Sequence, residues 1–169
     1  MPRPIREIRI EGKIAYVPLT RGYEAVIDAQ DVPMVGEWNW YAETRRHGVY
    51  ARRDEQVGDI RLRIYLHRQI LGNPNGIQID HIDGNGLNNL RSNIREATAE
   101  QNAHNQRISP KNKSGFKGVS WNRRDAKWQS FIRAGGKHLG LGSFDTPEAA
   151  HAAYCDASER LHGRFGRVA

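Results

Sequence analysis

The feature that most constrains this chain is a stretch of 27 residues, 80–106, that reads DHIDGNGLNNLRSNIREATAEQNAHNQ. It contains six Asn, two Asp and two His, but only four large apolar side chains. An ordinary solvent-facing surface would use Lys and Glu instead. Short Asn, Asp and His side chains serve in tight turns, or they hold a metal ion and move a proton. The flanking sequence must decide which of these two uses applies here.

Length and composition are typical of a soluble globular protein. The 169 residues suffice for one ordinary domain or two small ones, with 38% hydrophobic and 27% charged residues. No apolar run approaches the ~20 residues of a membrane helix, and the N-terminal segment has no apolar signal core. We therefore expect a cytoplasmic protein with no membrane partner. The single cysteine, Cys155, excludes an intramolecular disulfide and a Cys-rich zinc site, so no zinc is expected.

The excess of positive charge lies in the C-terminal part of the chain. Residues 1–102 contain 14 Lys and Arg and 14 Asp and Glu, whereas residues 103–169 contain 12 basic and 5 acidic residues. The whole net charge of +7 therefore comes from residues after 102. Such an excess predicts a polyanionic partner, nucleic acid first, although a merely soluble basic surface would give the same count.

Residues 1–66 are predicted to be β-rich. Apolar and polar residues alternate in IREIRIEGKIAYVPL around a turn at residues 11–12. They alternate again in VYARR and RLRIYL, on either side of a polar turn, DEQVGD. The run EWNWYA alternates as well. Its Trp38, Trp40 and Tyr41 are interpreted as core residues of a small sheet rather than as stacking surfaces for bases.

A strand, a loop and a helix are predicted around the polar stretch. Residues 67–71 favour a short helix, and residues 77–80 favour a strand that runs into the stretch. A helix follows from Thr98 to about residue 107, and Gln101 stands at capping-box spacing. This arrangement can bring Asp80, His81 and Asn102 to one point. Carboxylate and amide oxygens suit magnesium, and a His beside such a metal can take a proton from water.

At these positions the sequence resembles the HNH (ββα-metal) endonucleases, most of all their phage and intron-homing branch. The resemblance implies that Asp80 and Asn102 ligate one divalent metal ion, Mg²⁺, with Mn²⁺ as the alternative. It implies that His81 is the general base, and that Asn93 holds the loop and orients His81 by hydrogen bonding. The last position of the motif is often His in that family and is Asn102 here. His104 stays open as a ligand, although on a helix it would face elsewhere.

Two residues just before the motif also match that branch, which often has Leu-His-Arg at this place. His67 is therefore a candidate for binding the scissile phosphate, and Arg68 is a candidate DNA contact. A purely structural role for His67 is an equal alternative. His151 and His162 are expected on the surface of the last helix.

The C-terminal part is predicted to be a small sheet with one helix. Residues 107–115, RISPKNKSG, form a basic linker that carries Lys111 and Lys113 as DNA contacts. Three strand-like runs follow, FKGVSWN, KWQSFIRA and KHLGLGSF, and they predict a meander. A helix then begins at Pro147 and ends at Gly163. Small Ala residues allow this helix to lie close against the sheet.

Residues 114–165 resemble the plant Apetala-two/ethylene-response-factor DNA-binding domain, in the elements FKGV, KWQSFIR, LGLGSFDTPEAAHAAY and RLHG. In that family a three-stranded sheet enters the major groove of double-stranded DNA and the helix backs it. The residues then expected to contact DNA are Lys117, Ser120, Asn122, Arg124, Gln129, Phe131, Arg133, Lys137 and His138. Alternation would place against the helix Val119, Trp121, Trp128, Ser130, Ile132, Leu139 and Leu141.

The plant pattern is not fully kept, because the plant sheet presents many Arg and Trp side chains to the bases. This chain has at corresponding places Ser120, Asn122, Phe131 and Gly140. The plant target sequence therefore does not carry over. Arg124, Arg133 and Lys137 remain the best candidate contacts to the DNA backbone.

Together these features predict an α+β protein. Residues 1–106 form a β-rich region with the ββα-metal HNH motif at about 67–106, residues 107–115 form the linker, and residues 116–169 form a three-stranded antiparallel sheet packed on one helix. The predicted function is a metal-dependent HNH endonuclease of the homing or phage type that hydrolyses DNA in the bacterial host. One active site per chain predicts a nick by a monomer, with a dimer needed for a double-strand break. The alternatives are a non-catalytic DNA-binding regulator with an HNH scaffold and, more remotely, an RNA-binding module.

Overall fold

The chain forms two structural units, Met1–Thr98 and Ala99–Ala169, in the computed structural model, which describes residues 4–45 and 48–168. Strands and helices are both present in several short elements, so the predicted α+β class is confirmed. The sequence predicted a boundary within residues 107–115, whereas these units divide before the helix that follows Thr98. Within the described residues, no helix is both long enough and apolar enough to span a membrane.

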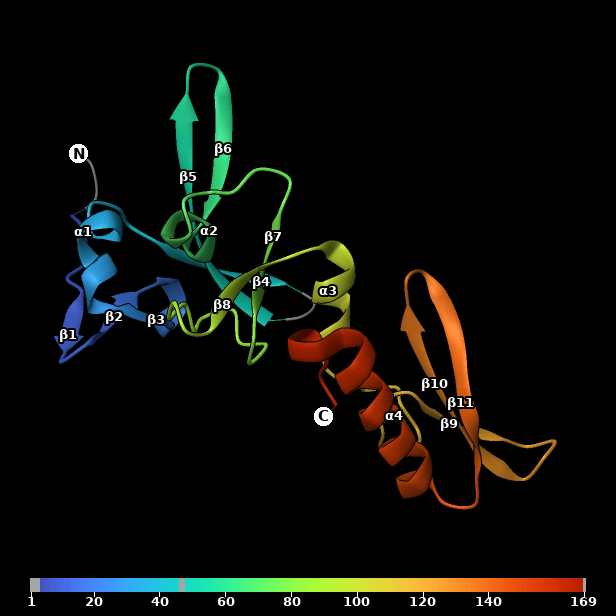
Figure 1. Ribbon diagram of the computed structural model, residues 1–169. Coiled ribbons are helices and arrows are strands. Elements are labelled where there is room, and N and C mark those ends of the chain that lie inside the picture. Colours follow the sequence, from blue (N-terminus) through green and yellow to red (C-terminus); the bar gives the residue numbers. More distant parts are fainter. Residues whose placement is uncertain (1–3, 46–47, 169) are drawn as a thin grey trace. The chain divides into compact units, whose positions relative to one another are not determined.

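The described part of the first unit contains three antiparallel sheets with strand orders β1-β2-β3, β4-β5-β6 and β7-β8 (Figure 1). The strands are β1 (Arg9–Glu11), β2 (Ile14–Pro18), β3 (Glu24–Asp28), β4 (Tyr41–Arg45), β5 (Gly48–Val57), β6 (Ile60–Tyr65), β7 (Gln78–His81) and β8 (Ile94–Ala97). Between them lie η1 (Thr20–Gly22), η2 (Ala29–Asp31), α1 (Val32–Val35) and α2 (Leu66–Ile70). The predicted β-rich region and short helix are thus confirmed.

Trp40 is the largest side chain in the core of the first unit. It is fully buried, as are Ile27 and Leu66, and its indole Nε1 donates a hydrogen bond to the Val35 carbonyl at 3.0 Å. Its predicted role as a core residue is therefore confirmed. Trp38 differs, because it stays partly exposed and the Arg53 guanidinium lies 3.9 Å from its ring centroid.

The longest hairpin of the first unit joins β5 to β6 and extends past the end of β4 in Figure 1. The sequence predicted a turn across residues 54–59, but β5 continues to Val57 and pairs with β6 up to Ile60. The turn itself is only two residues long, and Gly58 adopts the left-handed φ of 58° that such a turn requires. The polar residues of DEQVGD therefore belong mostly to a strand, which gives the hairpin two distinct faces.

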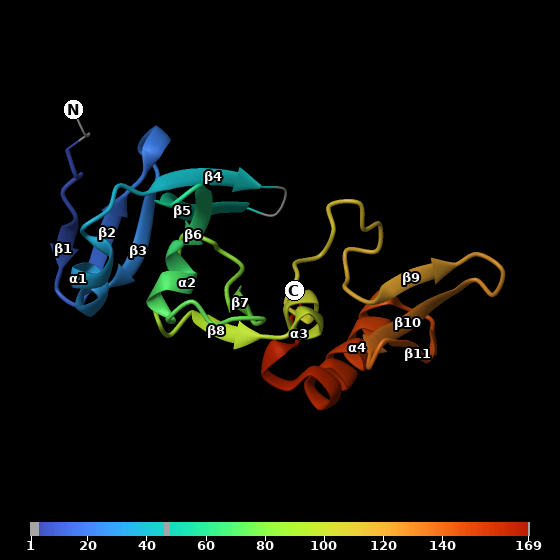
Figure 2. The ribbon, with the colours of Figure 1, turned by 90° about the horizontal axis from the view of Figure 1, so that it is seen from above.

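The second unit has one sheet, of strand order β11-β10-β9, and α4 lies against it (Figure 2). Its described elements are α3 (Ala99–His104), β9 (Val119–Asn122), β10 (Lys127–Ala134), β11 (Lys137–Phe144), α4 (Pro147–His162) and η3 (Gly163–Phe165). The predicted meander and helix are confirmed. Thr146 caps α4 by accepting a hydrogen bond from the Ala149 amide at 3.2 Å, and Gly163 ends the helix with a φ of 51°.

The core of the second unit lies between α4 and β10. Ile132 and Tyr154 are buried there, and Gly118 approaches so closely that a Cβ atom at its position would lie 2.1 Å from the Tyr154 ring. Trp121 and Leu139 were expected against the helix, yet they are 47% and 38% exposed. Trp121 packs edge-on against Trp128 instead, and the register of β10 against β11 shifts just before Phe131, which changes the alternation beside Leu139.

The helix α3 belongs to the second unit because several contacts hold its C-terminal end. The Lys117 ammonium donates to the carbonyls of His104 and Gln106 at 2.7 and 2.8 Å. The His104 ring stacks on the His162 ring with centroids 3.5 Å apart. His162 was expected at the surface but is buried, and its Nε2 donates to the Arg133 carbonyl at 2.8 Å.

Candidate active site

The hairpin of β7 and β8 positions Asp80 and His81, the two residues that end β7. Asp80 pairs with Arg95 and His81 pairs with Ile94 across the two strands. Successive side chains on a strand point to opposite faces, so Asp80 and His81 face different surroundings although they are adjacent. Both side chains are buried. The polar loop 82–93 connects the two strands.

A hydrogen bond from the imidazole of His81 fixes its tautomer. Its Nε2 lies 3.2 Å from Oδ1 of Asn89, while Nδ2 of Asn89 donates to the Leu87 carbonyl at 3.0 Å. The amide oxygen of Asn89 therefore faces the ring and accepts the Nε2 proton. The lone pair of His81 then resides on Nδ1, the atom that would accept a proton from water.

Asn89 itself is anchored by the backbone. It is fully buried, and its backbone N–H donates to the Val26 carbonyl at 2.7 Å. The backbone N–H of Val26 in turn donates to the Leu87 carbonyl at 2.8 Å. These bonds dock the loop on β3. The sequence did not predict a role for Asn89, because only its hydrogen bond to His81 in the folded chain distinguishes it from the other Asn residues of the loop.

Burial lowers the pKa of His81 below its ordinary value. The hydrogen bond to Asn89 and the negative charges of Asp83 and Asp80 act in the opposite direction but do not cancel the effect of burial. His81 is consequently a neutral imidazole near pH 7. This is the form that a general base requires.

Asn93 holds the loop together. Its Nδ2 donates to Oδ1 of Asp83 at 2.9 Å and to the Asn88 carbonyl at 2.8 Å, and its Oδ1 accepts from the Asp83 amide at 3.1 Å. These bonds agree with the loop-holding part of the role expected for Asn93. The hydrogen bond to the His81 ring described above is made by the side-chain amide of Asn89.

Asp80 forms a close ion pair with Arg95. Nε and Nη2 of Arg95 both donate to Oδ2 of Asp80, at 2.9 and 2.7 Å, and both side chains have little exposure. A carboxylate next to a neutral imidazole is a suitable oxygen donor for Mg²⁺, so its chemistry fits the expected metal. Among residues 4–45 and 48–168, no three His, Cys, Asp or Glu side chains converge as a metal-binding group. Asn102, the other expected ligand, lies half-buried on α3 in the second unit.

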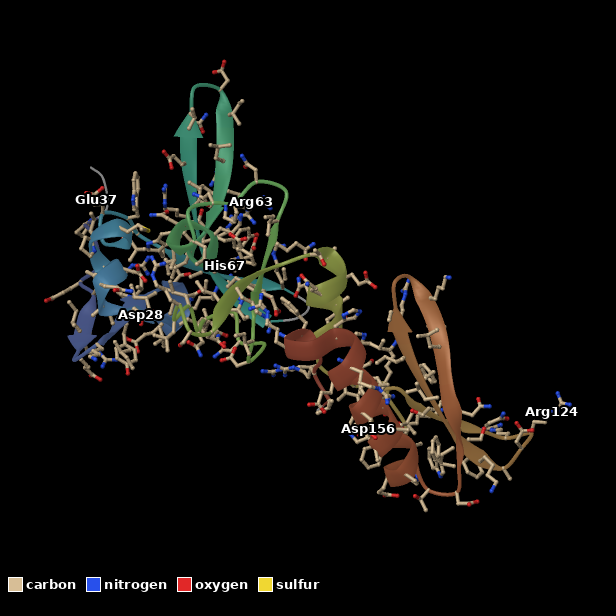
Figure 3. The ribbon with its side chains drawn as sticks, in the orientation of Figure 1. Asp28, Glu37, Arg63, His67, Arg124 and Asp156 are labelled. Atoms are coloured by element: carbon tan, nitrogen blue, oxygen red, sulfur yellow. The ribbon has the colours of Figure 1, made fainter. Side chains whose placement is uncertain are left out.

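His67, which is labelled in Figure 3, packs against His81. The two ring centroids are 4.9 Å apart, and the Tyr50 ring lies about equally far from each, at 6.1 and 6.0 Å. His67 is 8% exposed, and burial lowers its pKa to about 3, with smaller contributions from His81 and Arg68. Its Nδ1 is buried without a hydrogen-bond partner in the described part of the chain. The structure therefore brings together two histidines that are 14 positions apart in sequence.

Two predicted DNA contacts are engaged within their own unit. The guanidinium of Arg68 donates to the carbonyls of Ile77, at 2.8 Å, and Pro74, so it holds the loop after α2. The Lys117 ammonium donates to the carbonyls of His104 and Gln106 at the C-terminal end of α3, and burial lowers its pKa to about 8. Neither side chain is directed freely to solvent, because each is needed to close a loop.

The other predicted DNA contacts lie on exposed or half-buried positions of the second unit. Arg124 projects from the turn between β9 and β10, as Figure 3 shows. The exposed positions are Lys111, Lys113, Ser120, Arg124, Phe131, Arg133, Lys137 and His138, and the half-buried ones are Asn122 and Gln129. Asn122 also shapes the turn, since its side chain accepts from the Arg124 amide at 3.0 Å.

Comparisons with known proteins agree with this geometry. The HNH endonuclease family model matches residues 66–104, the segment that contains His67, His81 and Asn102. Protein 3.8 of Escherichia phage T7 is 39% identical over 94 residues, which cover 56% of this chain and 77% of that protein. An uncharacterized HNH endonuclease of Acanthamoeba polyphaga mimivirus is 31% identical over 147 residues, which cover 86% of this chain and 74% of that protein.

The chain therefore belongs to the HNH endonuclease family. A shorter similarity exists to an AP2-like ethylene-responsive transcription factor of Arabidopsis thaliana, which is 41% identical over 58 residues. These residues are 34% of this chain but only 12% of the plant protein. No solved structure matches.

Proposed function

We propose that the protein is a metal-dependent DNA endonuclease of the phage or homing type. The observation that carries this proposal is the state of His81, which is buried, neutral and held by Asn89 with its lone pair on Nδ1. A regulator that uses this fold only as a scaffold has no need for a fixed tautomer next to a buried carboxylate. The family membership supports the same chemistry.

In the proposed mechanism His81 removes a proton from water, the hydroxide oxygen attacks the phosphorus of the scissile phosphodiester, and the bond from phosphorus to the leaving sugar oxygen breaks. The Nδ1 atom accepts the proton, while Asn89 keeps the ring in place through Nε2. A divalent metal ion bound at Asp80 would stabilise negative charge on the phosphate and on the leaving oxygen, and Asn102 is the second ligand that the family resemblance implies. His67 is neutral because of its low pKa, so it would act on the phosphate as a hydrogen-bond donor rather than as a cation.

The sheet of β9, β10 and β11 would supply affinity for double-stranded DNA. Support comes from the positive charge of residues 103–169 and from the similarity to the AP2-like factor. Arg124, Arg133 and Lys137 are the proposed contacts to the DNA backbone. One active site per chain predicts single-strand nicks by a monomer, and a dimer would be required for coordinated double-strand cuts.

The test is the conversion of supercoiled plasmid to relaxed circles, with Mg²⁺ or EDTA, by the wild type and by His81→Ala. We expect relaxed circles only with metal and intact His81. His151→Ala, which changes a histidine on α4, should cut like the wild type. Cleavage by His81→Ala or in EDTA would contradict the mechanism. A protein that binds plasmid, phage and host DNA but cuts none of them would be the non-catalytic DNA-binding regulator instead.

A further inference from the structure

The sheet of β4, β5 and β6 has one face on which arginines predominate. Directly paired residues of an antiparallel sheet point to the same side, so the register defines this face. Its side chains are Tyr41, Glu43 and Arg45 from β4, Tyr50, Arg52, Asp54 and Gln56 from β5, and Arg61, Arg63 and Tyr65 from β6. These residues are termed the arginine face. They include four Arg and only two acidic residues, so the face is positive by two charges.

The arginines of this face are only partly neutralised. Asp54 accepts from Arg61 and also lies 3.5 Å from Arg52. Glu43 lies 2.6 Å from Arg45 and 3.3 Å from Arg52, so two carboxylates serve three guanidinium groups. Nε of Arg52 is buried and has no hydrogen-bond partner in the described residues. Arg63 is exposed, and within residues 4–45 and 48–168 it forms no hydrogen bond or ion pair. Together these side chains line a hollow on the face, which leaves guanidinium donors directed at a common space.

The arginine face is continuous with the candidate active site. Tyr50 stands on it two residues before Arg52, and its ring centroid lies 6.0 Å from that of His81. Tyr65, which pairs with Arg52 across the strands, stacks on His67 with centroids 5.6 Å apart. A strand advances ~3.3 Å per residue, so the face runs roughly 20 Å from Tyr50 to the level of Arg61. A duplex lying along it would pass directly to His81.

The opposite face of the same hairpin has a different character. It carries the apolar residues Ile60 and Leu62, of which Ile60 is 64% exposed, and its only Arg, Arg53, is used internally. Arg53 pairs with Glu55 at 2.7 Å and covers the Trp38 ring. A polyanion would therefore be attracted to the arginine face rather than to the opposite face of the hairpin. The positive charge of the arginine face does not show in the net charge of residues 1–102, which is zero, because most acidic residues of this segment lie outside the face.

We propose that the arginine face binds the phosphate backbone of duplex DNA next to the scissile phosphodiester, and this rests on the proposed nuclease function. The planar guanidinium fork suits phosphate, and a two-stranded β-ribbon fits the major groove of DNA. Arg61 and Arg63 make the outer contacts and Arg52 the inner one. The first unit thus contributes its own DNA-binding surface rather than relying on the second unit alone.

The test compares the full-length chain with the double variant Arg61→Gln and Arg63→Gln. Duplex binding is measured by fluorescence anisotropy in EDTA, where no cleavage occurs, over a series of salt concentrations. The loss of two phosphate contacts should reduce the slope of log K against log salt by about two and weaken binding roughly 10- to 100-fold at 0.1 M salt. Both side chains are exposed, Arg61 by 72%, so the fold should be retained, as circular dichroism would check.

The matched control removes two positive charges from the β1–β2 hairpin of the same unit, with Arg9→Gln in β1 and Lys13→Gln in the turn. It should bind with nearly the wild-type slope, and an equal loss in the control would overturn the proposal. Wild-type binding by the Arg61/Arg63 variant would also overturn it, whether or not the wild type cuts plasmid. If the variant loses affinity but the wild type never cuts, the surface is supported and the nuclease function alone fails.

Discussion

Asn89 is the residue on which the chemistry of His81 depends most directly. Its amide oxygen accepts the Nε2 proton and so leaves the lone pair on Nδ1. Asn89→Ala should therefore slow single-turnover cleavage by roughly 10- to 100-fold, as losses of such orienting partners commonly do, while DNA affinity stays unchanged. Asn89→Asp keeps the oxygen acceptor but loses the Nδ2 donor to the Leu87 carbonyl, so it should cut more slowly than the wild type but faster than Asn89→Ala. The measurement is the plasmid-nicking rate at saturating enzyme.

Asn88→Ala provides the control for this prediction at residue scale. Its side-chain amide donates to Asp83 at 2.8 Å and not to the His81 ring. The substitution should therefore slow cleavage less than Asn89→Ala does. If the two variants are equally slow, the loop as a whole matters and the tautomer of His81 does not.

At the scale of elements, the β7–β8 hairpin is joined by the buried pair of Asp80 and Arg95. Arg95→Met removes the counter-charge of a buried carboxylate, which typically costs about 3–5 kcal/mol of unfolding free energy. A metal ion that binds Asp80 would supply the missing charge. We therefore expect Mg²⁺ to raise the thermal midpoint of Arg95→Met more than that of the wild type, because binding to the native state alone stabilises it.

The same unit offers a matched pair for this experiment. Arg91 binds the buried Asp31 at 2.8 Å, where no metal is expected. Arg91→Met should also lower the thermal midpoint, but Mg²⁺ should restore none of it. Equal Mg²⁺ effects on both variants would show that the ion does not act through Asp80.

At the scale of the whole molecule, the charge of residues 103–169 should govern the overall affinity for DNA. Replacing Arg124, Arg133 and Lys137 by Gln should lower the slope of log K against log salt by about three, because each phosphate contact releases about one counterion. Lys127→Gln is the control, since its ammonium is paired with Asp145. An unchanged slope in a salt titration of the triple variant would remove the sheet of β9, β10 and β11 from the DNA interface.

The sequence predicted those parts of the fold that local patterns determine. The meander of β9–β11 and the helix α4 have clear alternation, Pro147 at the start and Gly163 at the end, and both are confirmed. The strands β3 and β8 were not predicted. β8 lies inside the polar stretch, and its pairing with β7 depends on a loop whose hydrogen bonds cannot be read from spacing alone.

The candidate site was predicted at Asp80 and His81 because the motif is contiguous there. Asn93 and His67 were also predicted, whereas the contributions of Asn89 and Tyr50 were not. Tyr50 lies beside His81 only because of the register of β5, and Asn89 and Asn88 are indistinguishable by type. Lys117 looked like a DNA contact by charge, although its partners are two backbone carbonyls. Residue type thus identifies donors, while packing decides where each is used.

The attachment of α3 to the second unit limits how such proteins can be recombined. Lys117 and Arg167 bind the end of α3, the former at the His104 carbonyl and the latter at Asn105. A chimera spliced within the linker 107–115 would separate α3 from both partners. A crossover placed between Thr98 and Ala99 keeps them together. When the C-terminal unit is exchanged between proteins, in phage genomes or by protein engineering, α3 should therefore be transferred together with it.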